Sequence, residues 1–378
     1  MNQRRSKFAP ILLLIDDPGT SVDKSVYQLS DGKIGAIATE PHLKELNPNQ
    51  FDPPRFKSSL PPERQSWVKY DGKVFAVGTY ARSLEARLVV NQVKGDRMIP
   101  KILSSVWCAA VQNQLPQKFS AAIAGLLPPS EMAAAERIMP QLVEALSEFE
   151  TPTGVYRVKA QVDFLSEGRG ISLYKEMNDP AYLDRTCVFF MIGFRNATAL
   201  VTRHGVPQND VGGRSEYLGF SHMLRLVQNS SEDQTSLEAL AEAICAAGHE
   251  VKLEKLFPIT RHRHGPEQLA EAGRLRQSIL QARDRYLKDL LEWMDEEMPR
   301  SYDEIIFCGG TAEYLAQALT ETRFRPTYMN VSFHGGVELP EGFPDRGLGC
   351  RFYDPYAALE YYSGEVFPHL LEEPAEVV

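Results

Sequence analysis

The sequence predicts an α/β protein whose two halves are built alike. Each half contains short apolar segments with the length of strands, and each opens with a strand–turn–strand hairpin followed by strands and helices. Hairpin strands are antiparallel and strands joined through a helix are parallel, so each half is expected to form a mixed sheet. The repeated order suggests an internal duplication, although the two hairpins share little sequence.

The first half is expected to open with a three-stranded meander whose first turn is "DPGTSVD". A proline-rich stretch at 41–62 is expected to be a loop. "WVKYDGKVFAVG" predicts a hairpin that turns at Asp71-Gly72. Ser130 is expected to cap a helix that Pro140 kinks. The remaining expected elements are strands at 12–15, 25–29, 34–38, 119–127 and 155–164, a helix at 98–115, and a short helix in "SEGRGISLYKEM".

The second half repeats this organisation. "CVFFMIG" predicts a buried strand, which a polar turn connects to a returning strand. A long helical region follows, and "EIIFCGG" then predicts a strand that ends in paired glycines. The expected ranges are strands at 187–193, 199–202 and 304–310, helices within 217–297, a helix from 312 and a last helix at 355–362.

Composition limits the classes of function. The formal net charge of -9 argues against a broad nucleic-acid-binding surface, although an acidic protein can reach DNA through a partner. The cysteines show no CxxC spacing, and three lie in apolar surroundings, which is typical of reduced core thiols. No stretch approaches transmembrane length. We therefore expect a soluble cytoplasmic protein that does not bind membranes.

Three glycine-containing turns follow apolar strands: "DDPGTSVDK", "MIGFRNAT" and "CGGTAEY". Backbone N–H groups in such turns can bind phosphate oxygens, and the hydroxyls of Thr20, Ser21 and Thr198 and the charge of Lys24 add to this capacity. Neither a GxxxxGK[ST] loop nor a GxGxxG fingerprint occurs in the usual strand–helix context. For any one turn alone, the alternative is an ordinary hairpin with solvated polar residues.

Taken together, the turns resemble those of a known superfamily. "DPGTSVDK" (17–24) resembles the first phosphate loop of the actin superfamily, D-x-G-[ST]-x-x-x-K, and "GGTA" (309–312) resembles its adenosine motif. "WVKYDGKVFAVGTYA", "FLSEGRGISLY" and the segment 282–299 are similar to the plasmid-segregation branch, the ParM/StbA-type actin-like proteins. The resemblance extends from about residue 11 to 362 in the correct order.

The resemblance implies an actin-like fold of two related domains, each with a mixed five-stranded sheet flanked by helices, and a nucleotide cleft between them. Domain I would comprise 1–166 and 345–378, and domain II 167–344, with a helical subdomain at about 206–300. The implied cofactors are ATP and Mg²⁺, with GTP as an open alternative to ATP.

The resemblance also implies roles for individual residues. Asp17 would act in catalysis by orienting the hydrated metal, and Glu167, in "SEGRG", would position the attacking water. The alternative for Glu167 is a carboxylate in the first turn of a helix, where it interacts favourably with the helix dipole. The implied phosphate-binding residues are Gly19, Thr20, Ser21, Lys24, Gly193, Arg195, Asn196 and Thr198. The implied adenosine-binding residues are Gly309, Gly310, Thr311, Ala312 and Tyr314.

The second phosphate loop departs from the superfamily pattern. It normally reads D-x-G, whereas this chain has Met191-Ile192-Gly193. A thioether is a poor partner for Mg²⁺, which prefers oxygen ligands and ordered waters. We therefore expect nucleotide binding with slow ATP hydrolysis, and leave open whether Met191 abolishes hydrolysis.

The resemblance implies a cytoskeletal ATPase that forms filaments when bound to ATP and segregates DNA, as in plasmid partition, with hydrolysis destabilising the filament. Its partners would be further copies of itself and a small DNA-binding adaptor protein, without direct DNA binding. Two alternatives remain: a nucleotide-dependent scaffold that hydrolyses nothing or very slowly, and a small-molecule kinase on the same fold.

Overall fold

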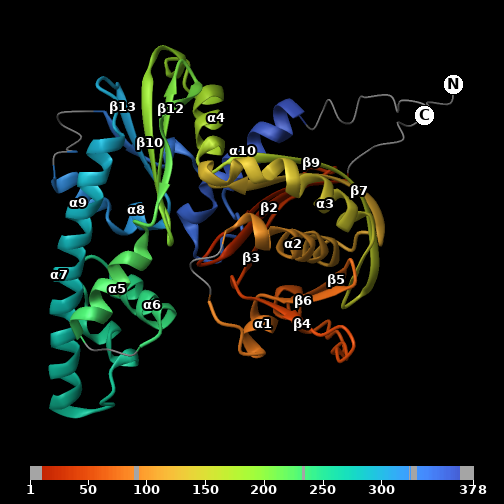
Figure 1. The fold of residues 1–378 in the computed structure, drawn as a ribbon, viewed down its shortest axis with the longest axis horizontal. Helices are drawn as coiled ribbons and strands as arrows, with labels where there is room; N and C mark the ends of the chain where they lie inside the picture. Colours follow the sequence, from red (N-terminus) through yellow and green to blue (C-terminus); the bar gives the residue numbers. More distant parts are fainter. Residues whose placement is uncertain (1–10, 89–92, 232–234, 323, 325–329, 367–378) are drawn as a thin grey trace. The chain divides into compact units, whose positions relative to one another are not determined.

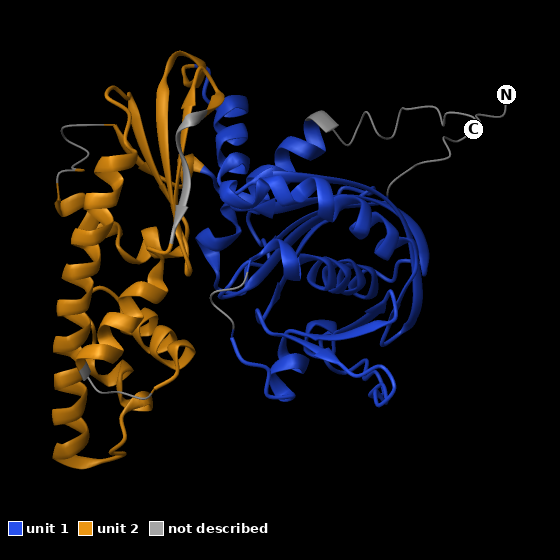
Figure 2. Cartoon of the chain, viewed as in Figure 1, with its two compact units in different colours: residues 1–180, 337–378 blue, residues 181–336 orange. Residues whose placement is uncertain are grey.

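The computed structural model describes residues 11–88, 93–231, 235–322, 324 and 330–366. The chain divides into two compact units (Figure 2). The first unit comprises Met1–Pro180 with Val337–Val378, and the second comprises Ala181–Gly336. These boundaries differ from the expected 166/167 and 344/345, since they place the segments 167–180 and 337–344 in the first unit.

A large mixed sheet forms the first unit. Its strands are β1 (Leu12–Pro18), β2 (Asp23–Leu29), β3 (Ile34–Thr39), β4 (Leu43–Leu46), β5 (Trp67–Tyr70), β6 (Lys73–Val77), β7 (Lys118–Leu127), β8 (Phe149–Thr151) and β9 (Gly154–Ser166). In the described part of the unit they follow the order β3-β2-β1-β7-β9-β8-β5-β6-β4. The expected meander β1–β3 is antiparallel, and β7 and β9 continue from β1 in parallel.

This sheet is wider than the five strands expected. The core β3-β2-β1-β7-β9 is extended because β9 is long enough to pair with β8 at its start and with β7 over the rest of its length. The hairpin β5–β6 turns at Asp71-Gly72 as predicted, and β4 pairs with β6. Since β4 lies within 41–62, the prediction that this whole stretch is a loop is wrong.

The sheet curls around one helix, α2 (Figure 1). The helices of this unit are α1 (Thr79–Ser83), α2 (Met98–Gln112), α3 (Ala135–Ser147), α4 (Arg169–Asn178) and α10 (Tyr353–Tyr361). Most of α2 is buried, including Lys101, because its apolar sequence faces sheet on several sides. Pro140 lies inside α3. Ser130 is not its cap: a 3₁₀ segment, Pro129–Ala134, precedes the helix, so the helix begins later than predicted.

The second unit contains a smaller mixed sheet. Its strands are β10 (Thr186–Ile192), β11 (Ala197–Arg203), β12 (Val206–Glu216), β13 (Glu304–Cys308) and β14 (Val331–Phe333), and its helices are α5 (Phe220–Ser231), α6 (Leu237–Ala247), α7 (Gly265–Glu297), α8 (Gly310–Tyr314) and α9 (Ala316–Glu321). The helical subdomain expected from about 206 begins instead with β12, an edge strand paired to β11.

The two sheets share one topology. Among the described residues the second sheet follows β12-β11-β10-β13-β14, with an antiparallel meander and then parallel strands. This is the order and direction of β3-β2-β1-β7-β9 in the first unit. The repeated organisation inferred from the sequence is therefore present in the topology of the strands.

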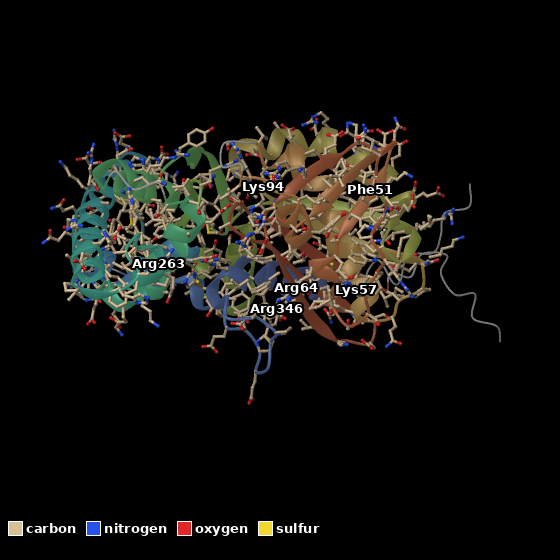
Figure 3. The ribbon with its side chains drawn as sticks, turned by 90° about the horizontal axis from the view of Figure 1, so that it is seen from below. Phe51, Lys57, Arg64, Lys94, Arg263 and Arg346 are labelled. Atoms are coloured by element: carbon tan, nitrogen blue, oxygen red, sulfur yellow. The ribbon has the colours of Figure 1, made fainter. Side chains whose placement is uncertain are left out.

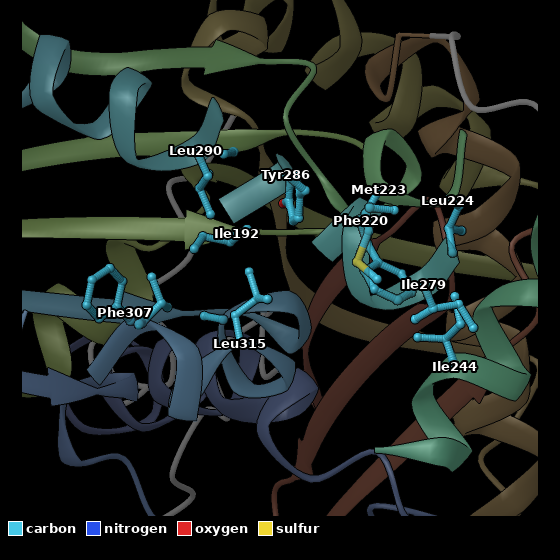
Figure 4. Packing of buried hydrophobic residues seen from close by; sticks show 14 of the residues in the cluster. Ile192, Phe220, Met223, Leu224, Ile244, Ile279, Tyr286, Leu290, Phe307 and Leu315 are labelled. Atoms are coloured by element: carbon cyan, nitrogen blue, oxygen red, sulfur yellow. The ribbon is translucent and has the colours of Figure 1, made fainter. Parts of the chain in front are cut away.

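Apolar side chains of α5, α6 and α7 pack with the second sheet (Figure 4). Ile192 and Phe307 contribute from the strands, and Ile279 and Leu290 from α7. Tyr286 is also buried there, and its hydroxyl donates to the Leu218 carbonyl at 2.6 Å. The apolar side of the long charged helix α7 is thus its packing face. No helix in the described ranges combines the length and apolar character needed to cross a membrane.

Helix α4 belongs to the first unit because it packs on α10. Buried Asp354 of α10 accepts from the backbone N–H of Gly168 at 2.7 Å and of Ile171 at 3.3 Å, at the start of α4. Burial raises the pKa of Asp354 to about 7. At Gly170 a Cβ atom would overlap the Asp354 carbonyl oxygen and lie 2.9 Å from the Ala358 nitrogen. The two helices approach closely only because residue 170 has no side chain.

Asp16 of β1 is a carboxylate in the core of the first unit. The Ser25 hydroxyl donates to its Oδ1 at 2.5 Å and lies 2.8 Å from Ser105 Oγ of α2. Its Oδ2 is buried without a hydrogen-bond partner in the described structure. Burial raises the pKa of Asp16 to about 7. Cys108, Cys187 and Cys308 are also fully buried, in agreement with the expected core thiols.

Replacing Gly170 with alanine is expected to destabilise the protein by about 2 kcal/mol, since the added methyl group forces α4 away from α10. Gly273→Ala is the control, because a Cβ there meets nothing within 4 Å and alanine favours the helix α7. Urea unfolding followed by circular dichroism measures both variants. Equal effects at the two positions would contradict the close packing.

The Asp16→Asn variant tests the buried carboxylate through pH. The pKa of Asp16 is about 7 in the folded protein, against an ordinary value of 3.8, so between these values the folded state holds a proton that the unfolded state releases. Wild-type stability therefore falls as pH rises through this window and levels off above it. The free energy of unfolding of the variant, relative to wild type, should rise by roughly 2 kcal/mol between pH 5 and 7. Asp31→Asn, at an exposed turn, should show no such trend.

Candidate functional site

The first hairpin turn joins β1 to β2 and carries a paired charge at its base. The register places Asp17 directly opposite Lys24, and Lys24 Nζ lies 2.5 Å from Asp17 Oδ2. Residue 19 must be glycine, because a Cβ there would lie 2.5 Å from the Val22 carbonyl oxygen. Thr20 and Ser21 occupy the turn and are partly exposed. The turn predicted from sequence is therefore formed, with Lys24 held at its base.

A lysine outside the predicted motifs completes this group. Lys94, labelled in Figure 3, donates to Asp17 Oδ1 at 2.5 Å and to Glu167 Oε1 at 2.7 Å. Burial alone would raise the pKa of Asp17, but Lys24 and Lys94 outweigh it and lower that pKa. Burial alone would lower the pKa of Lys94, but Asp17 and Glu167 outweigh it and raise that pKa. Asp17 is ionised and Lys94 charged at neutral pH.

Glu167 lies where β9 ends and α4 begins. Its backbone N–H donates to the Leu127 carbonyl at 2.8 Å, and the next residue, Gly168, adopts a left-handed conformation. Asp354 holds the Gly168 N–H. These contacts fix the backbone of Glu167 beside Lys94 and Asp17. The structure therefore brings together Asp17, Lys24 and Glu167, as expected if they serve one site.

Next to the turn is a polar pocket in the first unit. It is lined by Pro18, Gly19, Thr20, Pro41, Val93, Lys94, Arg97 and Lys101. Lys101 pairs with Asp23 at 2.8 Å, and Arg97 donates to the Leu43 carbonyl at 3.4 Å. Burial raises the pKa of Asp23 and lowers that of Lys101. Basic side chains thus face the glycine turn, an arrangement that favours an anion.

The sequence contains a signal for these basic residues that lies outside the phosphate-loop motifs. Lys94, Arg97 and Lys101 are spaced by three and four residues from the 3₁₀ segment Gly95–Arg97 into α2, which places them on one side of the helical path. Lys101 is also a lone charge within an apolar helix, and buried charges are retained when they are paired. The partners Asp17 and Glu167 could not be found in this way, because they come from distant parts of the chain.

The second hairpin, β10–β11, has the same antiparallel pairing as the first but carries different side chains at its base. Met191 is directly opposite Thr198, just as Asp17 is opposite Lys24 in the first hairpin. The glycine of each hairpin comes two residues after Met191 or Asp17. Met191 therefore corresponds to Asp17 and Thr198 to Lys24. An ion pair in the first unit is replaced by a thioether and a buried hydroxyl in the second. The missing carboxylate noted in the sequence is accompanied by a missing cation.

In the second unit, the predicted phosphate and adenosine residues are in contact. Thr311 Oγ1 donates to the Gly193 carbonyl at 2.8 Å, and the Gly193 N–H donates to the Asn196 carbonyl at 2.9 Å. At Gly309, with φ of 93°, a Cβ would lie 2.5 Å from the Ile192 carbonyl oxygen. The Gly309 turn thus packs directly against the end of β10.

Other predicted residues of this unit are largely buried. The Arg195 carbonyl accepts from the Gly219 N–H at 3.2 Å. Ala312, at the buried start of α8 beside Gly310, contributes its methyl group to the core. Tyr314 packs edge-on against Phe220 with ring centroids 5.3 Å apart. Any contact of Ala312 with a nucleotide would come from its backbone.

The side chains at the first turn do not form a ready metal site. Both oxygens of Asp17, and Oε1 of Glu167, accept from ammonium groups. Lys24 and Lys94 already balance the charges of these two carboxylates. Mg²⁺ requires oxygen ligands and is attracted by uncompensated negative charge. The donor set therefore does not fit a divalent ion held by these side chains alone.

Comparison with known proteins identifies the fold. The sequence matches no protein-family model and no curated protein. Among solved structures, Bacillus thuringiensis ParM with ATP is 14% identical with a TM-score of 0.58, and the match covers 93% of this chain and 98% of that one. AlfA from the B. subtilis plasmid pLS32, solved as a filament, is 14% identical with a TM-score of 0.56, covering 93% and 99%. Ta0583, an archaeal actin homologue, is 14% identical with a TM-score of 0.61, covering 93% and 99%. The chain has the actin-like fold.

Proposed function

We propose that this chain is a ParM-type ATPase that forms filaments in the cytoplasm when it binds ATP. The observation that carries the proposal is the repeated sheet, in which each copy presents a glycine-bearing turn between its first two strands. Similarity to a ParM solved with ATP and to AlfA solved as a filament supports it.

The two units contribute different groups to nucleotide binding. In the first unit, the backbone of Gly19 to Ser21 and the Lys24 ammonium bind phosphate oxygens. In the second unit, Gly193, Arg195, Asn196 and Thr198 bind phosphate, and residues 309–314 bind the adenosine. Within the second unit, the two groups of residues approach closely, since Thr311 is hydrogen-bonded to Gly193. Asp17 and Glu167 are already paired with lysines, so these side chains would not hold Mg²⁺ themselves, and the phosphates of ATP would supply its oxygen ligands.

Glu167 positions the attacking water during hydrolysis. Its backbone is fixed at the junction of β9 and α4, and Lys94 Nζ holds its carboxylate by donating to Oε1 at 2.7 Å. Phosphoryl transfer depends on positioning and on charge placed around the transferred group. With Met191 in place of the second aspartate, turnover is slow.

The filament segregates DNA through a small adaptor protein. The net charge of -9 opposes direct binding to the phosphate backbone of DNA and favours a basic adaptor. Hydrolysis of ATP destabilises the filament.

A non-hydrolysing scaffold is the second candidate. The observation that favours it is the paired loss of charge in the second hairpin, where Met191 and Thr198 correspond to Asp17 and Lys24. Such a chain would assemble with ATP without releasing phosphate.

Electron microscopy of the purified protein is expected to show filaments with ATP·Mg²⁺ and none with ADP. Phosphate release measured on the same sample separates the ATPase from the scaffold. Filaments that form equally in both nucleotides, or not at all, would contradict nucleotide-dependent assembly.

Glu167→Gln is expected to slow phosphate release by about 100-fold while ATP-dependent light scattering is retained, because the amide cannot act as a base toward water. Glu176→Gln, on the following helix α4, is the matched control and should behave as wild type. Unchanged turnover in the Glu167 variant would remove this residue from catalysis.

A further inference from the structure

We propose that Lys94 is a tethered cation that binds the phosphates of the nucleotide, so that this chain binds ATP with only weak dependence on a divalent metal. This inference rests on the proposed nucleotide binding and concerns how the charge of the phosphates is neutralised. It starts from the mismatch between the first turn and a metal site.

One of the three N–H donors of Lys94 is not used by Asp17 or Glu167. An ammonium group has three N–H donors, and two of those of Lys94 are used by Asp17 and Glu167. The third has no acceptor among the described residues. Because the side chain is only 8% exposed, this donor is held at a fixed place next to the glycine turn. It is available to an oxygen atom that a ligand brings into the pocket.

The pocket identifies that ligand as an anion. Lys94 and Arg97 line it together with Gly19 and Thr20. The Gly19 N–H already donates to the Asp17 carbonyl at 2.7 Å, so Thr20 supplies the backbone and hydroxyl donors of the turn. Lys101 lines the same pocket while it is paired with Asp23. The pairs Asp17–Lys24, Lys94–Glu167 and Asp23–Lys101 balance in charge, so Arg97 leaves this group with a positive excess.

A positive excess in the pocket reduces the need for a metal ion to neutralise the phosphates. In a site built from bare carboxylates, the negative charges of protein and phosphates repel, and a divalent ion is needed to join them. Here the carboxylates are neutralised in advance by lysines of the chain. The phosphates therefore meet an electropositive pocket whether or not a metal accompanies them.

Tethering makes a single positive charge more effective. Lys94 is immobilised by two carboxylates before the ligand arrives, so little side-chain freedom is lost on binding. A charged hydrogen bond between a lysine and a phosphate is also stronger than a neutral one. Lys94 is therefore expected to replace part of the affinity that Mg²⁺ would supply.

The test is calorimetric titration of the full chain with a non-hydrolysable ATP analogue, in excess Mg²⁺ and in EDTA. We expect the wild-type affinity to fall less than tenfold when the metal is removed. Lys94→Met should lose at least a further tenfold in EDTA, equivalent to about 1.4 kcal/mol, and much less in Mg²⁺. Lys94→Arg should retain binding in EDTA, and Lys73→Met, at the exposed start of β6, should match wild type.

The outcomes of the titration distinguish failure of the inference on Lys94 from failure of the proposed function. Wild-type binding that requires Mg²⁺ would overturn the inference and leave the proposed function intact, and this comparison needs no variant. An equal loss for Lys94→Met in both conditions would assign Lys94 a purely structural role and also overturn it. An absence of wild-type binding in both conditions would instead overturn the proposed function.

Discussion

The bridge from Lys94 to Asp17 and Glu167 is the interaction on which the site in the first unit depends. It joins the first hairpin turn, the residues that lead into α2 and the junction of β9 with α4. A buried charge is stable only when it is paired, so loss of one member leaves the others uncompensated. The position of the first hairpin turn and that of Glu167 are thereby set together.

The repeated topology shows how a duplicated framework can hold unequal halves. Both sheets place a turn after their first strand, yet the pair at its base is Asp17–Lys24 in one and Met191–Thr198 in the other. The framework depends on apolar strands and on glycines, which both copies keep. The charges are not needed for folding, so they can differ between the copies. In this chain the ionic groups at the hairpin base are concentrated in the first unit.

Local patterns in the sequence predicted the elements that local physics determines. The meander β1–β3, the hairpin β5–β6 and helix α2 each combine apolar segments with clear turns or ends. By contrast, β4 and β12 are edge strands, and only pairing with β6 and β11 makes them strands. The glycine turns were predictable for the same local reason. The contacts of Lys94 were not, because its partners are 77 and 73 residues away and are brought close by the sheet topology.

The same arrangement relates binding to turnover. An interaction accelerates hydrolysis only if it is stronger in the transition state than in the ground state. Lys94 is fixed in place by Asp17 and Glu167, so in the proposed site it would attract the phosphates of bound ATP as well as the group being transferred. Its charge therefore contributes more to affinity than to rate. The proposed function therefore combines firm nucleotide binding with slow hydrolysis, and in a nucleotide-dependent filament slow hydrolysis lengthens the lifetime of the ATP-bound polymer.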